Sequence, residues 1–254
     1  MPPFVDRFAF AAGNYASYRP RYPDALFEWL FEQLPTAQRV WDCGTGSGQA
    51  AVALASRFPH VVATDPSLAQ LACAEGADRL DYAAMAAEKC AIQDRSVDLI
   101  TVAQALHWFD RDAFFGEVKR VLRPDGLLAI WSYGLCEIDP ALDEVLRHFH
   151  DVTVGPYWSP ARRLVESGYA GIELPFNEVS APDFPMQASW TLAQLGGYLA
   201  TWSAVGQYRS ATREDPMPAV MRVLGERWGG HETARVVRWP LRLRVGSPRP
   251  SRPR

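Results

Sequence analysis

The sequence predicts an α/β fold built around a parallel sheet. Short apolar segments that suit strands alternate with helical stretches between residues 24 and 134, which is the pattern of repeated strand–helix units. The segment 96–106 is nearly continuous in apolar residues, as a parallel strand covered on both faces should be. A glycine-rich turn at 44–48 joins the first apolar segment to a helical stretch. These three observations favour an open sheet that binds its ligand where the strands end.

The individual elements follow one another in a regular order. Pro23 opens the first helix, over 24–34, in which leucine and phenylalanine recur on one face. Strands are expected at 39–44, 60–67, 80–88, 96–106 and 127–134, and helices at 48–58, 68–77 and 112–122. The last of these helices is stopped by the Pro-Asp-Gly sequence at 124–126.

The alternation of strands and helices is lost after about residue 135. Helical stretches are expected at 140–151, 191–206 and 217–228, with a proline-broken stretch at 171–187 and an alternating, strand-like segment at 233–246. We therefore divide the chain into an N-terminal helical segment and ligand-binding core (1–134), a cap that sets substrate choice (135–232), the final strand or strands of the core sheet (233–246), and a disordered, basic, proline-rich tail (247–254).

Composition and charge narrow the range of partners. The chain has 254 residues, of which 48% are hydrophobic, and a net charge of −3, so it gives no electrostatic footprint for nucleic acid. It has no apolar run near the roughly 18 residues of a membrane span. Asp6 and Arg7 lie where a secretory signal would be apolar, so a cytoplasmic protein is expected. The spacing of its His and Cys residues suits no metal site, and no feature predicts an oligomeric state.

The most informative motif is the turn after the first strand. Asp42 is followed by glycines at alternate positions, Gly44, Gly46 and Gly48, and then by a helix. Glycines permit a tight turn and a close approach of ligand to backbone, and a helix start offers free amide donors. A dinucleotide site has its third glycine one place later, and Asp42 would repel a pyrophosphate. The spacing therefore prefers S-adenosylmethionine, whose methionine portion is cationic, over NAD.

A second acid supports this interpretation. Asp65 closes the second apolar strand, 17 residues after Gly48, where this class of fold places a carboxylate on the ribose hydroxyls, at a separation of about 20 residues. A carboxylate can accept two donors at once. The alternative role, capping the next helix, suits Ser67 better. Two acids at two strand ends indicate a ligand site at one edge of the sheet.

With these motifs in place, the chain resembles a known family. The stretches DCGTGSGQ, ATDPS, AEKCAIQDRSVDLITVAQALHWFD and VKRVLRPDGLLAIWSYG are similar to class I S-adenosylmethionine-dependent methyltransferases, and most similar to the trans-aconitate methyltransferase-like group of small-molecule enzymes. The resemblance is strong over 39–134 and loose over 137–230. It implies a Rossmann-like sheet of seven strands, mostly parallel with an antiparallel last strand, and a helical and aromatic cap.

The resemblance also implies roles for particular residues. It implies that the cofactor is S-adenosylmethionine, with S-adenosylhomocysteine as its product. By the same resemblance, the residues that hold the cofactor are Tyr18 and Arg19 over it, Asp42, Gly44, Gly46 and Gly48 beside its methionine portion, Asp65 with Pro66 at its ribose, and Ala87 and Glu88 near its adenine. Gln104 is implied to begin a methyl-transfer end that reaches Trp108. Here Lys89, Cys90 and Ala91 depart from the Leu-Pro pair of many members, so the resemblance defines the adenine contact through Glu88 only to within about a residue.

His107 and Trp108 are the candidate catalytic residues, because they follow the fourth strand where substrate and cofactor should meet. With its ordinary pKa, His107 is either a general base or a hydrogen-bonded side chain that shapes the pocket. Trp108 is either a pocket wall or a core anchor. A carboxylic acid is one candidate acceptor. Its carboxylate would pair with arginine, for which the chain offers Arg21 and the cap residues Arg162, Arg163, Arg209 and Arg213.

The leading hypothesis is therefore a methyltransferase that acts on a small molecule. Two other functions remain open at this stage: an NAD(P)-dependent oxidoreductase, against which Asp42 and the early third glycine count, and a protein that binds S-adenosylmethionine without catalysis. Methylation of RNA or DNA is disfavoured, because the fourth strand is not followed by an Asn-Pro-Pro-aromatic motif and the chain has no basic domain.

Overall fold

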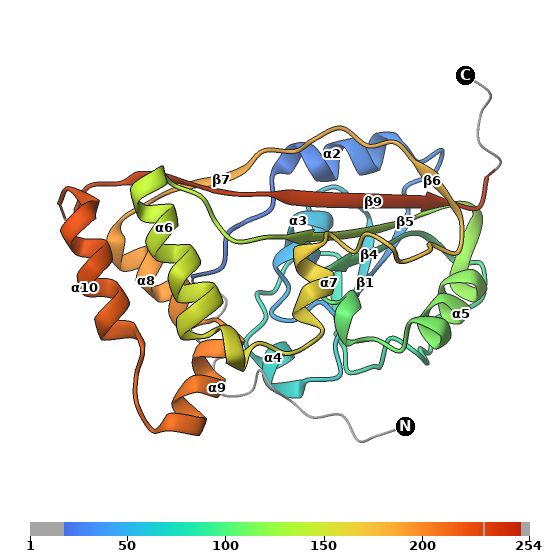
Figure 1. Ribbon diagram of the computed structural model, residues 1–254. Coiled ribbons are helices and arrows are strands. Elements are labelled where there is room, and N and C mark those ends of the chain that lie inside the picture. Colours follow the sequence, from blue (N-terminus) through green and yellow to red (C-terminus); the bar gives the residue numbers. More distant parts are fainter. Residues whose placement is uncertain (1–17, 231, 250–254) are drawn as a thin grey trace.

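The structure, a computed structural model, describes residues 18–230 and 232–249 and has the predicted α/β fold (Figure 1). Its main sheet has seven strands in the order β3-β2-β1-β4-β5-β9-β6. These strands are β1 (Arg39–Cys43), β2 (His60–Thr64), β3 (Leu80–Ala83), β4 (Val97–Ala103), β5 (Leu122–Tyr133), β6 (Asn177–Val179) and β9 (Leu241–Ser247). The first five run parallel, and β9 is antiparallel to both β5 and β6. The mostly parallel sheet with an antiparallel last strand is confirmed.

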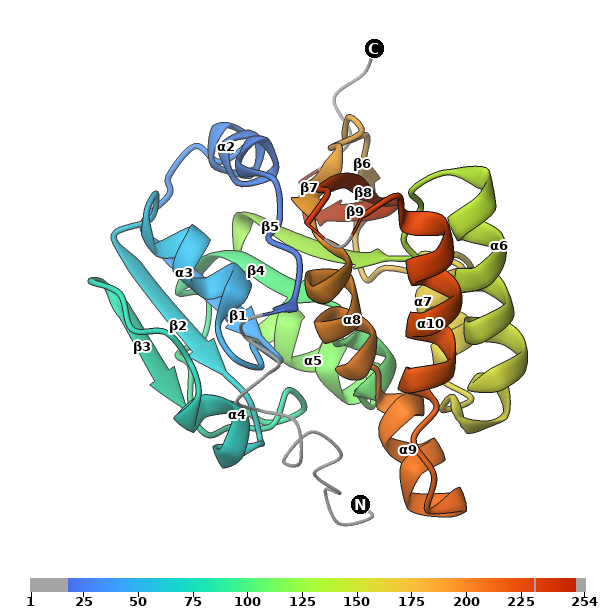
Figure 2. The same ribbon diagram turned by 90° about the vertical axis from the view of Figure 1, so that its left-hand side faces the viewer.

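Helices cover both faces of this sheet because its strands are apolar on both sides. Val40 and Leu99 pack toward α2 (Asp24–Glu32) and α3 (Gln49–Ala55), whereas their neighbours Trp41 and Ile100 pack toward the opposite face, with α5 (Arg111–Val121) and α7 (Arg162–Glu166). Figure 2 shows α2 and α3 together on one side of the strands. In the described part of the chain, none of the helices is long and apolar enough to cross a membrane.

A helical cap lies beyond the end of the sheet at which β5 finishes (Figure 1). It contains α6 (Pro140–His148), the π-helical turn η2 (Phe149–Thr153), the short 3-10 helix η3 (Gly155–Tyr157), α8 (Leu192–Ala200), α9 (Ser203–Thr212), α10 (Met217–Trp228) and a two-stranded sheet of β7 (Met186–Trp190) and β8 (Arg235–Trp239). These elements share an apolar cluster of their own, which Tyr133 joins from the end of β5. The parallel strands therefore point their carboxyl ends toward the cap.

The predicted division after residue 135 needs three corrections. First, β6 lies within 135–232 but pairs with β9, so this segment also supplies an edge strand of the main sheet. Second, the segment 233–246 is two strands, because Pro240 has no N–H to continue one ladder: β8 pairs with β7 in the cap, and β9 enters the main sheet. Third, Ser247 ends β9 and accepts a hydrogen bond from the Arg249 backbone at 3.2 Å, so the predicted tail starts too early; residues 250–254 lie outside the described chain.

Asp98 anchors the segment that leads into β1. This carboxylate, in β4, is only 1% exposed. It accepts hydrogen bonds from the Thr36 hydroxyl at 2.9 Å and from the backbone N–H groups of Gln38 and Arg39 at 3.0 and 2.9 Å. Arg123 donates to the same carboxylate at 3.0 Å. A buried charge with four donors is well compensated, and it ties the loop before β1 to β4.

We expect Asp98→Ala to lower the free energy of unfolding by about 3 kcal/mol, because it leaves buried backbone donors without an acceptor. Chemical denaturation of the variant and the wild type measures this loss. Asp81→Ala is the control, since Asp81 is an exposed residue of β3, and its effect should stay within about 0.5 kcal/mol. Equal losses in the two variants would contradict the role given to Asp98.

Candidate active site

The glycine turn between β1 and α3 forms the floor of the site. Gly44, Gly46 and Gly48 have positive φ values of 70°, 57° and 86°, a region that other residues adopt at a cost. The turn is also tightly packed. A Cβ atom on Gly44 would lie 2.6 Å from the Cβ of Ala105, and one on Gly48 would lie 2.0 Å from the Tyr82 hydroxyl. The backbone conformation favours glycine at all three positions, and at Gly44 and Gly48 a side chain would also lack space.

Two carboxylates hold this turn from different strands. Asp42, at 0% exposure in β1, accepts hydrogen bonds from the hydroxyls of Thr45, in the turn, and Thr101, in β4, both at 2.6 Å. Asp65, just after β2, accepts from the backbone N–H of Gly46 at 2.9 Å and of Ser67 at 2.8 Å. The turn is thus fixed relative to three neighbouring strands.

A cavity opens over the turn, at the carboxyl edge of the sheet. It encloses about 600 Å³ of space, part of it open to solvent. Its lining combines the glycine turn and the start of α3 with residues from the ends of β2, β4 and β5: Tyr22, Gly44, Thr45, Gly46, Ser47, Gln49, Ala50, Asp65, Gln70, Ala103, Gln104, Ala105, Trp108 and Tyr133. Asp65 and Gln104 were predicted to lie together here, and the structure brings them to one cavity.

A second cavity of about 600 Å³ lies between this edge of the sheet and the cap. It is lined by aromatic and basic side chains: Arg19, Gln104, His107, Trp108, Trp158, Ser159, Arg162, Val165, Tyr198, Trp202 and Ser203. Gln104 and Trp108 line both cavities. The two spaces therefore meet at the residues that follow β4.

Comparison with known proteins identifies this arrangement. A family profile for a methyltransferase domain matches residues 41–130. A Dictyostelium discoideum protein named as a methyltransferase is 35% identical over 225 residues, which is 87% of this chain and 86% of that protein. A solved structure from Anaeromyxobacter dehalogenans, titled as a type II methyltransferase, is 41% identical, with a TM-score of 0.85 over 92% of this chain and 99% of that one.

The chain belongs to the class I S-adenosylmethionine-dependent methyltransferase family. A Saccharomyces cerevisiae protein named as an S-adenosylmethionine-dependent methyltransferase is also similar, with 27% identity over 82% of each chain. These relatives set aside the alternative of an NAD(P)-dependent oxidoreductase. The narrower resemblance to trans-aconitate methyltransferases stays a prediction.

The residues around the first cavity of this methyltransferase fit S-adenosylmethionine. The amide oxygen of Gln70 and the hydroxyl of Ser47 are buried without a hydrogen-bond partner among the described residues, and both residues line the cavity. Asp65 lines the same cavity, and because a carboxylate can accept more than two donors, it would receive ribose hydroxyls there. Asp65, Gln70, Ser47 and the backbone of the glycine turn are thus the groups that would hold the cofactor. Gln70 and Ser47 were not predicted, although Gln70 lies one turn after the Ser67 cap of α4 (Leu68–Ala72).

The predicted contact of Asp42 with the methionine portion stays a prediction, and the structure shows which groups the Asp42 carboxylate contacts within the protein. The carboxylate is fully buried beneath the turn, and Thr45 stands between it and the cavity. Burial raises the pKa of Asp42 to about 6, against the opposing effect of the hydrogen bonds from Thr101 and Thr45. Asp42 therefore holds the turn in place from beneath. The acid two positions before Gly44 is thus a structural anchor of the loop in this structure.

The predicted adenine contacts also stay predictions, and the structure shows which other contacts these residues make. Ala87 is buried in the apolar cluster beneath α5, and Glu88 accepts the backbone N–H of Asp110 at 2.9 Å, just before α5 begins. Neither residue belongs to the lining of the cofactor cavity, and Pro66 lies beside that lining without forming part of it. Glu88 is thus occupied in joining the segment after β3 to the start of α5.

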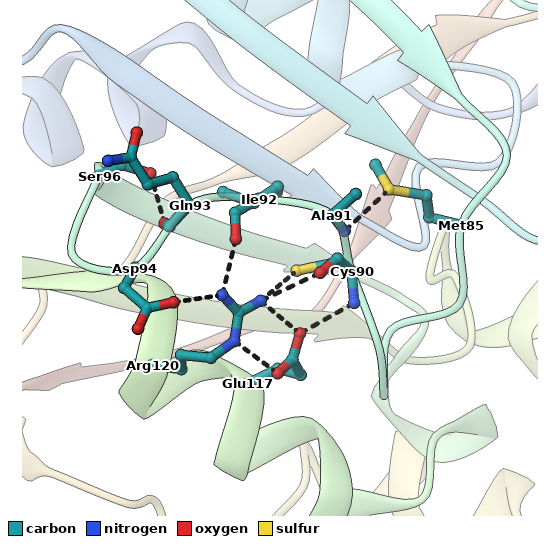
Figure 3. A network of polar contacts seen from close by, with 9 residues as sticks. All are labelled: Met85, Cys90, Ala91, Ile92, Gln93, Asp94, Ser96, Glu117 and Arg120. Atoms are coloured by element: carbon teal, nitrogen blue, oxygen red, sulfur yellow. Dashed lines mark hydrogen bonds and ion pairs between the residues drawn. The ribbon is translucent and has the colours of Figure 1, made fainter.

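A polar network holds the rest of that segment to α5 (Figure 3). Arg120 donates to the carbonyl oxygens of Cys90 at 3.1 Å and Ile92 at 2.7 Å, and to the carboxylates of Asp94 at 2.6 Å and Glu117 at 2.7 Å. Glu117 in turn accepts the backbone N–H of Cys90 at 2.9 Å. The hydrogen bond from Arg120 lowers the pKa of Glu117 to about 2, so the pair stays charged at neutral pH.

Gln104 marks the junction of the two cavities. It has a φ of 57°, which is strained for a residue with a side chain. Its backbone N–H donates to the Trp131 carbonyl at 2.9 Å, and its amide donates to the Tyr133 carbonyl at 3.2 Å. The amide oxygen has no hydrogen-bond partner among the described residues. The strand ends therefore hold Gln104 in a conformation that leaves an acceptor at the predicted methyl-transfer end.

His107 lies on the 3-10 helix η1 (Leu106–Trp108) and faces the second cavity. Its Nδ1 is 3.1 Å from the Tyr169 hydroxyl. Burial, and to a smaller extent the charge of Arg162, lower the pKa of His107 to about 3. The side chain is therefore neutral at physiological pH and is a weak proton acceptor, so the structure favours the pocket-shaping role. Trp108, 37% exposed, is a cavity wall.

The aromatic and basic residues predicted for the site lie at different places in the structure. The Tyr18 ring packs on Gly197 of α8, and Arg19 donates to the Tyr133 hydroxyl at 3.0 Å while its guanidinium lies 5.5 Å from the centre of the Tyr198 ring. Arg162 lines the second cavity. The remaining candidates lie elsewhere: Arg21, Arg163 and Arg213 are exposed, and Arg209 pairs with Asp215.

The buried carboxyl of Asp42 predicts a specific dependence of stability on pH. Its folded-state pKa of about 6 lies above the ordinary value of 3.8, so its contribution to stability is fully present below the ordinary value and is lost as the pH rises through the folded value. Between about pH 4.5 and about pH 7.5, the wild type should lose about 2 kcal/mol more unfolding free energy than Asp42→Asn. Chemical denaturation of both proteins without ligand measures this. A constant difference between them across that range would refute the burial of an ionisable Asp42.

Proposed function

We propose that this methyltransferase transfers its methyl group to a carboxylate of a small-molecule acceptor. The observation that carries the proposal is the second cavity, in which two guanidinium groups, those of Arg19 and Arg162, line a space that joins the cofactor cavity at Gln104 and Trp108. Among the described residues that line this cavity, none is acidic. Two guanidinium groups at one cavity would attract and hydrogen-bond an acceptor that carries a negative charge.

The protein holds both arginines in place by stacking and hydrogen bonding. The Arg162 guanidinium lies 4.6 Å from the centre of the Trp158 ring, and its Nε is 3.5 Å from the Glu166 carboxylate one turn along α7. Arg19 is oriented by Tyr133 and by the Thr201 carbonyl, to which it donates at 3.3 Å. Arginines fixed in this way lose little side-chain freedom when they bind a carboxylate, which favours recognition of a planar anion.

The chemistry suits such an acceptor. When bound, S-adenosylmethionine supplies a methyl group on a sulfonium, and its transfer to a carboxylate oxygen forms a C–O bond, leaves the electron pair of the broken C–S bond on sulfur and releases no proton. The site needs to position the acceptor and exclude water, and it needs no base. The low pKa of His107 agrees with this requirement.

The cap supplies most of the acceptor cavity, so we assign acceptor choice to residues 135–232. Trp158, Tyr198 and Trp202 provide aromatic walls, while Ser159 and Ser203 add hydroxyls. Walls of this kind accept an apolar or planar body.

The proposal is tested by scoring carboxylic acids, phenols and amines as acceptors with methyl-labelled S-adenosylmethionine. We expect label in a base-labile methyl ester. For the acid that is turned over, Arg162→Gln should raise KM by about 10-fold or more, because a charged hydrogen bond to the acceptor is lost.

Arg163→Gln is the matched control, because Arg163 is the next residue of α7 and is exposed. Its KM should match that of the wild type. Turnover of phenols or amines with every acid inert, or an Arg162→Gln variant with unchanged KM, would refute the carboxylate acceptor.

A further inference from the structure

Tyr169 is a buried residue that the proposed reaction does not yet use. It lies three residues after α7, is 1% exposed and stacks beside His107, with ring centres 6.2 Å apart. Its hydroxyl is 3.1 Å from His107 Nδ1. Neither the glycine turn, the cofactor cavity nor any motif of the sequence gives this hydrogen bond a role.

The backbone of Tyr169 is strained and is held by hydrogen bonds to both its N–H and its carbonyl group. Its φ is 61°, in the left-handed region that costs about 1 kcal/mol or more for such a residue. Its N–H donates to the Leu164 carbonyl at 2.8 Å. Its carbonyl accepts from Arg244 of β9 at 2.6 Å, and Arg244 also holds the Ile172 carbonyl at 2.7 Å. The fold therefore fixes Tyr169 in an unfavourable conformation that aims its ring at His107.

The direction of the hydrogen bond follows from the groups around the hydroxyl. Burial raises the pKa of Tyr169, so the phenol keeps its proton. A buried O–H group has to place that proton on an acceptor. His107 Nδ1 is the acceptor within reach among the described residues.

We propose that Tyr169 is a positioning residue that donates to His107 Nδ1 and so holds the imidazole neutral with its proton on Nε2, where it donates a hydrogen bond into the acceptor cavity. This inference rests on the proposed carboxylate acceptor for the identity of the group that receives the bond. The titratable and charged groups that face the ring are Tyr169 itself and Arg162 of α7. A second positive charge beside Arg162 is avoided, because the ring stays neutral.

As a consequence, the site is selective for acceptor groups that are already deprotonated when they bind. A donor at Nε2 stabilises a carboxylate oxygen, whereas a phenol or an ammonium group would find neither a base nor an acceptor on this ring. Tyr169 thereby acts through His107 on which acceptor is bound, and it touches neither reacting group.

The state of the ring is measured directly by long-range ¹H–¹⁵N NMR of the full chain with ¹⁵N-labelled histidine. The chain has five histidines, and His107→Gln assigns the signals of this one. We expect Nε2 protonated and Nδ1 unprotonated in the wild type from about pH 7 to about pH 5, where ordinary histidines become charged. In Tyr169→Phe the two neutral forms should mix. The control Tyr208→Phe, which removes a hydroxyl from α9 outside the cavity, should keep the wild-type pattern.

A proton on Nδ1 in the wild type would overturn the inference without the need for any variant, and so would an unchanged pattern in Tyr169→Phe. A second readout uses benzoate as the acceptor probe, titrated into protein saturated with S-adenosylhomocysteine. Tyr169→Phe should weaken benzoate binding by about 5-fold and leave the affinity for S-adenosylhomocysteine unchanged; equal benzoate affinities would count against the inference. Absence of benzoate binding to the wild type would count against the carboxylate acceptor, while the NMR result would still decide the role of Tyr169.

Discussion

The rest of the active site depends on the glycine turn after β1, which runs at positive φ at its three glycines and has no room for a side chain at Gly44 or Gly48. Such a turn is not stable by itself, and two carboxylates hold it. Asp42 and Thr101 are direct neighbours in the register of β1 and β4, so their hydrogen bond forms only when these strands pair correctly. Asp65 reaches Gly46 from the end of β2. The strand order of the sheet is therefore what gives the turn its shape.

The position of the acceptor site follows from the same strand order. Because β4 and β5 end side by side, Gln104 and Tyr133 meet, and the chain leaves β5 directly into the cap. The return of the chain through β8 and β9 then ties the cap to the sheet. The first cavity, built by the sheet, and the second cavity, which we propose as the acceptor site, thus share one wall, which would suit in-line transfer between two bound molecules.

The local parts of this account could be predicted from the sequence. The alternation of apolar segments, the glycine spacing and the strand-end acid gave the parallel sheet, the turn and the place of Asp65. The contacts that could not be predicted join residues that are distant in sequence. Asp42 accepts a hydrogen bond from Thr101, 59 residues away, and Glu88 accepts one from Asp110, 22 residues away. Single-sequence patterns carry no information on such pairs. The same reason explains why Arg162 could not be separated from Arg163, and why β6 was not recognised as a strand of the main sheet.

The central claim is that the clamped turn, with Asp65 and Gln70, forms a site for S-adenosylmethionine and not for a dinucleotide. Calorimetric titration of the wild-type chain with S-adenosylhomocysteine and, separately, with NAD tests it most directly. The account predicts micromolar affinity for S-adenosylhomocysteine and no measurable heat of binding with NAD. Binding of NAD with no binding of S-adenosylhomocysteine would contradict it.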